Sequence, residues 1–329
     1  MDFANFPKIE LHLHLDCSLS YEVVGKLRPG TTLREYRSSF TAPARCTNLA
    51  EYIACASAAI DLMQSPEALR LVTLDLFEQL QADQVLYAEI RFAPLQHLSG
   101  GLSPKEVVQI VEEATVEGIR KTGVEAGVIL CTLRHFSETQ SMETVQLVEA
   151  FSGTHIVGFD IAADEAGFPV DAHISAFRYA GEKGLFCTAH AGEARGADSV
   201  WETLEHFGPS RIGHGVRSIE DPDLIAYLKT HGIHLEVCPT SNIQTNMYED
   251  IASHPIDRLY QSGVSMSINT DGRSLSDTNL GEEYNRVFEA FNWEQAQFLK
   301  CNLEAIRHAF ISEEKKDMLR QKLLAGFAH

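Results

Sequence analysis

The sequence predicts an α/β protein whose fold is a (β/α)8 TIM barrel with extra helices after the first strand. Eight short, apolar, β-rich runs occur in the order IELHLHL at 9, VLYAEIRF at 85, AGVILCTL at 126, HIVGFDIA at 155, LFCTAH at 185, RIGHG at 211, IHLEVCP at 233 and VSMSINTD at 264. Most separations leave room for a helix, as in residues 103–123, where a helical periodicity follows an N-cap serine and closes on a glycine. Repeated β-then-α units favour a parallel barrel. A doubly wound open sheet is the alternative, but no GxGxxG follows the first run.

Chain length and composition predict a single domain over residues 1–329. With 44% hydrophobic residues the chain can bury a large core, and no composition shift, repeat or low-complexity run divides it. The segment from Arg28 to Leu80 is longer than one crossover connection needs. We therefore expect it to hold the extra helices, over the first strand.

The charge of the chain excludes several classes of partner. The formal net charge is −19 and the basic residues are scattered, so nucleic acid and anionic membranes would be repelled. No signal-peptide pattern and no run of membrane-spanning length is present, which predicts a soluble, cytoplasmic protein. The seven cysteines form no CxxC pair, so we expect reduced thiols.

Reactive or charged side chains stand near the end of almost every apolar run, where barrel enzymes build their active sites. They are His12, His14, Glu89, Arg91, Arg134, His135, Asp160, His190, His214 and Asp271. A lone histidine on an apolar segment is usually a core residue. His12 and His14, however, are two residues apart, so a strand directs both to one face, and a closed barrel would bring His190 and Asp271 round to them. Three imidazoles and a carboxylate suit zinc or another borderline divalent metal.

Five motifs taken together resemble the adenosine deaminase family of metal-dependent amidohydrolases. They are PKIELHLHLD at 7–16, HAGE at 190–193, RIGHG at 211–215, CPTSN at 238–242 and SINTD at 267–271. The resemblance runs from residue 7 to about 290, in the family's order. It implies a (β/α)8 barrel with one zinc ion per chain and hydrolytic removal of an amino group from a purine, without specifying the purine.

The resemblance also implies a role for each matching residue. The zinc ligands would be His12, His14, His190 and Asp271, which leaves one position for a water whose pKa the metal lowers towards about 7. Glu193 would protonate ring N1 while C6 is attacked, and His214 would orient the attack and stabilise the developing charge. Asp16 would hydrogen-bond the sugar of a nucleoside.

The chain departs from the family pattern at three positions. Gly272 stands where the family has a second acid that contacts purine N7, so that contact would be missing or come from Arg273 or Ser274. Ala163 replaces a glycine whose backbone N–H meets purine N3, and it adds a methyl group at close quarters. Cys17 replaces the glycine of the usual HLDG, near the expected ribose pocket. These changes predict altered selectivity in a diverged subgroup.

Several of these residues also have a purely structural interpretation. Glu193 could begin an exposed helix, and Asp16 could cap the helix that begins near Ser18. Glu89 and Arg91 could form an ion pair inside the barrel mouth. Asp164 and Glu165 could be solvated loop charges, and Ser241 and Asn242 are expected to bond neighbouring loops without a catalytic role.

The sequence leaves the substrate open. Adenosine or 2'-deoxyadenosine is the leading expectation, with inosine or deoxyinosine and ammonia as products. The alternatives are a 5'-modified adenosine resembling aminodeoxyfutalosine, free adenine or another aminated heterocycle. A zinc-containing binding protein without catalysis is the remaining class. The oligomeric state is not readable from the sequence.

Overall fold

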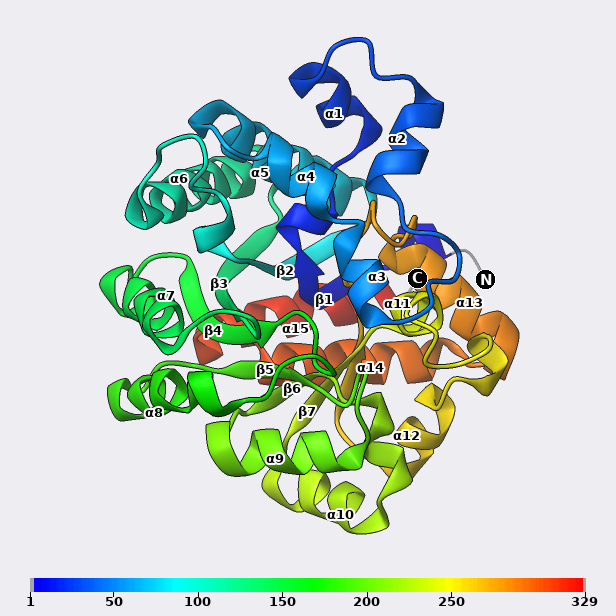
Figure 1. Cartoon of the computed structure of the whole chain (residues 1–329). Helices are drawn as coiled ribbons and strands as arrows, with labels where there is room; N and C mark the ends of the chain where they lie inside the picture. The colour runs from blue at the N-terminus through cyan, green and yellow to red at the C-terminus, as the bar shows by residue number, and fades with distance from the viewer. Residues whose placement is uncertain (1–2, 328–329) are drawn as a thin grey trace.

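The computed structural model describes residues 3–327 and contains the eight strands that the sequence predicts. They are β1 (Lys8–His14), β2 (Val85–Phe92), β3 (Glu125–Leu133), β4 (Ile156–Ala162), β5 (Thr188–Ala191), β6 (Arg211–His214), β7 (His234–Val237) and β8 (Met266–Ile268). Each is a short run of buried residues. In Figure 1 they occupy the middle of the molecule, with helices around them.

Every strand pairing is parallel, and the strands follow one another in chain order. They form two four-stranded sheets, β1 to β4 and β5 to β8. Two isolated bridges join the sheets, one between Phe159 and Cys187 and one between Leu13 and Asp271. At the second seam the backbone N–H of Asp271 donates to the carbonyl of His12 over 3.1 Å. The two seams close the sheets into the predicted barrel.

The helices alternate with the strands, as expected for repeated β-then-α units. They are α1 (Tyr21–Leu27), α2 (Leu33–Phe40), α3 (Leu49–Ala54), α4 (Ser57–Leu62), α5 (Pro66–Ala82), α6 (Pro104–Thr122), α7 (Glu138–Ala150), α8 (Ile174–Lys183), α9 (Ala197–Phe207), α10 (Pro222–His231), α11 (Pro239–Gln244), α12 (Ile256–Ser262), α13 (Leu280–Phe291), α14 (Gln295–His308) and α15 (Glu313–Phe327). The helix expected over residues 103–123 is α6, which begins with a capping box at Ser103 and ends at Gly123, whose φ is +75°.

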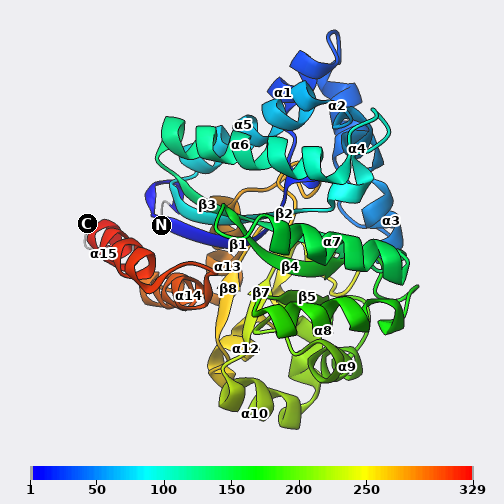
Figure 2. The ribbon, with the colours of Figure 1, turned by 90° about the vertical axis from the view of Figure 1, so that its left-hand side faces the viewer.

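The segment between β1 and β2 holds four helices besides the crossover helix α5, which confirms the expected insertion. Figure 2 shows α3 and α4 on one side of the barrel and α14 and α15 on the opposite side. Residues from α3 and α4 share a cavity with residues at the carboxyl ends of the strands. Among residues 3–327, no helix combines the length and the apolar character that a membrane span requires.

The interior of the barrel holds buried ion pairs among its apolar residues. Arg91 contacts Asp160 over 2.8 Å and Glu236 over 2.7 Å, and Glu89 contacts Arg211 over 2.5 Å. All five side chains are fully buried. Glu89 and Arg91 therefore form structural ion pairs, as the structural interpretation predicted. They pair with residues on other strands, however, and not with each other.

Candidate metal centre and catalytic cavity

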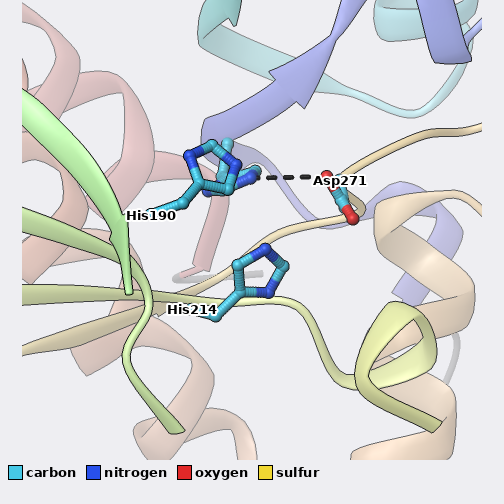
Figure 3. Close-up of side chains that lie close together, drawn as sticks. His190, His214 and Asp271 are labelled. Carbon is cyan, nitrogen blue, oxygen red and sulfur yellow. Dashed lines mark ion pairs between the residues drawn. The ribbon is translucent and has the colours of Figure 1, made fainter. Parts of the chain in front are cut away.

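The ends of four strands bring the predicted reactive side chains into one cluster. His12 and His14 come from β1, His190 from β5, His214 from β6 and Asp271 from the segment after β8. Figure 3 shows His190, His214 and Asp271 directed towards one another. Ligand atoms of His12, His190, His214 and Asp271 all lie within 4.8 Å of one another. The barrel thus assembles residues that are far apart in the sequence.

The spacing of these atoms fits a small divalent cation. Nε2 of His14 lies 3.3 Å from Nε2 of His190 and 3.4 Å from Oδ1 of Asp271. Nε2 of His12 lies 3.3 Å from the same oxygen and is buried without a hydrogen-bond partner. A tetrahedral zinc ion with bonds of about 2.0–2.1 Å would separate its ligand atoms by about 3.3 Å. The distances from His14 to His190, from His14 to Asp271 and from His12 to Asp271 match that separation. The set whose ligand atoms all lie within 4.8 Å of one another contains His214 and not His14.

Two buried carboxylates orient two of the histidines. Nδ1 of His12 donates to Glu236 over 2.9 Å, and Nδ1 of His190 donates to Asp160 over 3.2 Å. Burial alone would raise the pKa of Glu236, but the Arg91 guanidinium holds it well below its usual range. The pKa of Asp160 is lowered too, because the charges of His190 and Arg91 outweigh burial. Since both carboxylates accept at Nδ1, each histidine keeps an Nε2 lone pair directed into the cluster.

Two polar residues of the CPTSN motif, Ser241 and Asn242, contact the cluster directly, whereas the sequence suggested only bonds to neighbouring loops. The Ser241 hydroxyl donates to Oδ2 of Asp271 over 2.7 Å. Nδ2 of Asn242 lies 3.1 Å from Nδ1 of His214. Both residues are fully buried. No local pattern predicts these contacts, because Ser241 and Asp271 are 30 residues apart in the chain and Asn242 and His214 are 28 apart.

Glu193 lies at the edge of the cluster and is buried. Its Oε2 is 3.5 Å from Nε2 of His214, and its side chain is 4% exposed. Burial, followed by the charge of Asp271, raises the pKa of Glu193 well above its usual range. The following helix, α9, begins only at Ala197, which rules out the alternative of an exposed helix start. A neutral carboxyl group in this position can donate a proton.

Glu165 fixes the loop that carries Glu193. Its carboxylate accepts the backbone N–H groups of residues 192–195, and it also accepts from the Ser199 hydroxyl. Glu165 is buried, so it is not the solvated loop charge that the sequence allowed. Asp164 is more exposed and accepts two N–H groups of its own turn. The role of Glu165 escaped the sequence analysis, because a backbone amide carries no side-chain signal.

The backbone is left-handed at three non-glycine residues of the site. The φ angles are +79° at Ala163, +57° at His214 and +66° at Asp271. Such conformations cost free energy for residues other than glycine and gather at functional sites. Ala163 directly follows β4, and His214 is the last residue of β6. At these residues the backbone turns away from the direction of the preceding strand, at the mouth of the barrel.

A cavity of about 110 Å³ adjoins the cluster. Its lining includes cluster residues, Asp16, Cys17, Gln96, His135 and Ala163, with an apolar cover made by Leu49, Tyr52, Ile53, Ala56 and Ile60. The helices inserted after β1 therefore form the roof of the cavity.

Two of the predicted substrate contacts, Asp16 and Ala163, line this cavity. The hydroxyl of Ser20, and not Asp16, caps α1 by accepting from Val23 N over 3.1 Å. The capping interpretation of Asp16 is therefore wrong for that helix. Asp16 remains a buried acid facing the cavity, and burial raises its pKa to about 6.

The third predicted contact, Gly272, is not among the residues that line the cavity. A Cβ atom at this position would stand 2.6 Å from Cβ of Cys17, so Cys17 occupies the space of a side chain at 272. The departures at Cys17 and Gly272 are therefore linked, because the Cys17 side chain fills the space that a side chain at position 272 would need. Neither expected substitute lines the cavity, because Arg273 pairs with two buried carboxylates and Ser274 donates to the carbonyl of Cys17.

Replacing Ala163 with glycine should stabilise the fold. The change removes the Cβ that strains the left-handed backbone, so we expect the free energy of unfolding to rise by about 0.5–1 kcal/mol in urea titrations. Ala162→Gly is the matched control, because Ala162 lies in β4 and a glycine there should lower stability. Equal losses in both variants would contradict the strain argument.

Replacing Glu165 with glutamine should loosen the loop after β5. The new amide group would face backbone N–H donors that now have a carboxylate acceptor, so we expect a loss of about 1–3 kcal/mol in the free energy of unfolding. Amide hydrogen exchange should speed up across residues 192–195. Asp164→Asn serves as the control, with a smaller loss and unchanged exchange in that loop. Unchanged protection in Glu165→Gln would show that the carboxylate does not hold the loop.

Comparison with known proteins identifies the family of the chain. The sequence profile of the family described as adenosine deaminase matches residues 7–325. The adenosine deaminase of Clostridium perfringens is 34% identical over 338 residues, which cover 98% of this chain and 100% of the relative.

Solved structures share the fold. The adenine deaminase from Arthrobacter aurescens superposes with a TM-score of 0.90 at 25% identity, over 98% of this chain and 99% of that one. A zinc-bound amidohydrolase from Burkholderia ambifaria gives a TM-score of 0.89 at 21% identity, over 99% and 92% of the two chains. Because the profile match and the identity to the clostridial enzyme extend over almost the whole length, the chain belongs to the adenosine deaminase family of metal-dependent hydrolases.

Proposed function

We propose that the protein is a zinc-dependent hydrolase that deaminates a purine nucleoside, foremost adenosine or 2'-deoxyadenosine, to inosine or 2'-deoxyinosine and ammonia. The observation that carries the proposal is that a buried Glu193 lies beside the cluster of His12, His190, His214 and Asp271. Glu193, His190, His214 and Asp271 line one cavity. The family profile over residues 7–325 supports one catalytic domain.

His12, His14, His190 and Asp271 would hold the zinc ion, since three of the distances between their ligand atoms equal the separation expected of tetrahedral ligands. Zinc bound in the Burkholderia ambifaria relative supports this choice of metal. When bound, the ion would lower the pKa of a coordinated water and so supply the nucleophile near neutral pH. Glu236, Asp160 and Ser241 would keep the ligands in place through the hydrogen bonds described above.

Glu193 would protonate ring N1 while the oxygen of water bonds to C6. Its burial and raised pKa favour the protonated form that this step requires. His214, whose Nε2 lies 3.5 Å from Glu193, would stabilise the charge that develops on the attacking oxygen. Of the two water protons, one passes to the amino nitrogen and the other returns to Glu193. The bond between C6 and the amino nitrogen breaks, ammonia leaves, and C6 becomes a carbonyl.

The lining of the cavity favours a nucleoside over a nucleotide. Asp16 can accept a hydrogen bond from a sugar hydroxyl, and Ala163 also lines the cavity. Among the described residues, no lysine or arginine lines the cavity, so a phosphate would meet no cationic partner there. Adenosine and 2'-deoxyadenosine should therefore react far faster than AMP.

Free adenine is the second candidate substrate. It is favoured by the likeness to the Arthrobacter aurescens adenine deaminase, whose barrel superposes over 98% of this chain. The two candidates differ at Asp16, because adenine has no sugar for this acid to bind.

The Glu193→Gln variant should retain zinc and lose turnover. The amide has the shape of the acid but cannot transfer a proton to N1, so we expect kcat to fall by about 10²–10⁴-fold. Ammonia release from adenosine and metal content by atomic absorption are the two measurements. Asp164→Asn, an acid in a neighbouring loop, is the control and should keep full activity. Full turnover in Glu193→Gln would overturn the assigned role.

Asp16→Ala should separate the two candidate substrates. Loss of a charged hydrogen bond to the sugar should raise KM for adenosine by about tenfold or more, while kcat/KM for adenine stays unchanged. A panel of adenosine, 2'-deoxyadenosine, 5'-deoxyadenosine, AMP and adenine gives the ranking for wild type and variant. Adenine as the best substrate, with no effect of the substitution, would favour the second candidate. No ammonia from any compound would favour the non-catalytic zinc-binding class.

A further inference from the structure

A chain of buried hydrogen bonds leads from the backbone to His214. The N–H of Ile256 donates to Nδ1 of His254 over 3.1 Å. Nε2 of His254 lies 3.2 Å from Oδ1 of Asn242, and Nδ2 of Asn242 lies 3.1 Å from Nδ1 of His214. His214, Asn242 and His254 are each at most 2% exposed. Bulk water therefore does not replace any of these three side chains as a hydrogen-bond partner.

The donor and acceptor roles in this series of hydrogen bonds are set by its first bond, which comes from the backbone of Ile256. A backbone N–H can only donate, so Nδ1 of His254 must be an acceptor. Burial lowers the pKa of His254 to about 3, so the ring is neutral and carries its proton on Nε2. That proton is donated to the side-chain oxygen of Asn242, which sets the orientation of the amide. The NH₂ group of Asn242 is then left to donate to Nδ1 of His214.

We propose that Asn242 and His254 are positioning residues that lock His214 in the tautomer with its proton on Nε2. The Nε2–H group lies beside Glu193 and the metal cluster, where it can donate a hydrogen bond to the attacking oxygen. This inference rests on the proposed function for its catalytic consequence, but the tautomer itself does not depend on any activity.

The locked tautomer also decides which histidine completes the metal site. A histidine binds a metal through a nitrogen lone pair. In His214 the lone pair on Nδ1 is occupied by Asn242, and Nε2 carries the proton. Nε2 of His14 is directed into the cluster, 3.3 Å from Nε2 of His190 and 3.4 Å from Oδ1 of Asp271. In the proposed zinc site, His14 would then be the third histidine ligand, and His214 would stay free to act on the substrate.

The Asn242→Asp substitution tests the lock, because it keeps the shape of the side chain and replaces the donor with an acceptor. The carboxylate can still accept from His254, but His214 would have to place its proton on Nδ1 to bond it. We expect His214 to change tautomer, and kcat to fall by about 10²–10³-fold, as on loss of a donor to a developing oxyanion, with little change in KM. Asn242→Ala removes the donor without imposing an acceptor and should cost less in kcat.

The tautomer is read directly from long-range ¹H–¹⁵N correlation spectra of zinc-loaded protein labelled at histidine, with His214 assigned through His214→Gln. Asn302→Asp is the matched control for a buried charge, since Asn302 is 1% exposed and accepts from Ile9 N at the other end of β1. It should leave the His214 spectrum and kcat unchanged. A wild-type His214 protonated on Nδ1, or an Asn242→Asp variant with unchanged tautomer and kcat, would overturn the proposal. A wild type with the expected tautomer but no deaminase activity would confirm the lock and refute the proposed function.

Discussion

The site depends on one buried carboxylate in the middle of the barrel, that of Glu236 on β7. It accepts from Nδ1 of His12 over 2.9 Å, from Arg91 over 2.7 Å and from the Thr188 hydroxyl over 3.1 Å, and it lies 2.7 Å from Nε of Arg211. It thereby links β7 to β1, β2, β5 and β6. Loss of one member would leave the others buried and uncompensated, which costs about 3–5 kcal/mol. The Glu236 carboxylate therefore both pairs with the buried arginines of the barrel interior and orients His12 towards the cluster.

Around Glu236, the strands and the loops of the barrel position different groups of the site. The strands place the proposed metal ligands, because residues two apart on β1 share a face and the closing seam sets Asp271 beside them. Residues in the loops hold the two groups proposed to act on substrate. Glu165 gathers the amides around Glu193, and Asn242 holds the ring of His214. The chemistry therefore relies on residues that themselves touch neither metal nor substrate.

The sequence predicted the parts of this arrangement that leave a local pattern. Short apolar, β-rich runs predicted the strands, and the His12–His14 pair with the other motifs predicted the cluster that the structure assembles. It could not predict contacts between two residues that lie far apart in the chain and belong to no common sequence motif. Asn242 meets His214 and His254 only after folding, and Cys17 excludes a side chain at Gly272 only because the barrel closes. Glu165 was ambiguous because its partners are backbone amides.

Metal depletion followed by zinc titration tests the central claim most directly. The protein would be stripped by a chelator and zinc returned in fractions of an equivalent, with ammonia release from adenosine and bound metal measured at each step. The account predicts no ammonia from the stripped protein and activity that rises linearly to a plateau at one zinc per chain. Ammonia release from the metal-free protein, or full zinc binding without any release from adenosine, would contradict it.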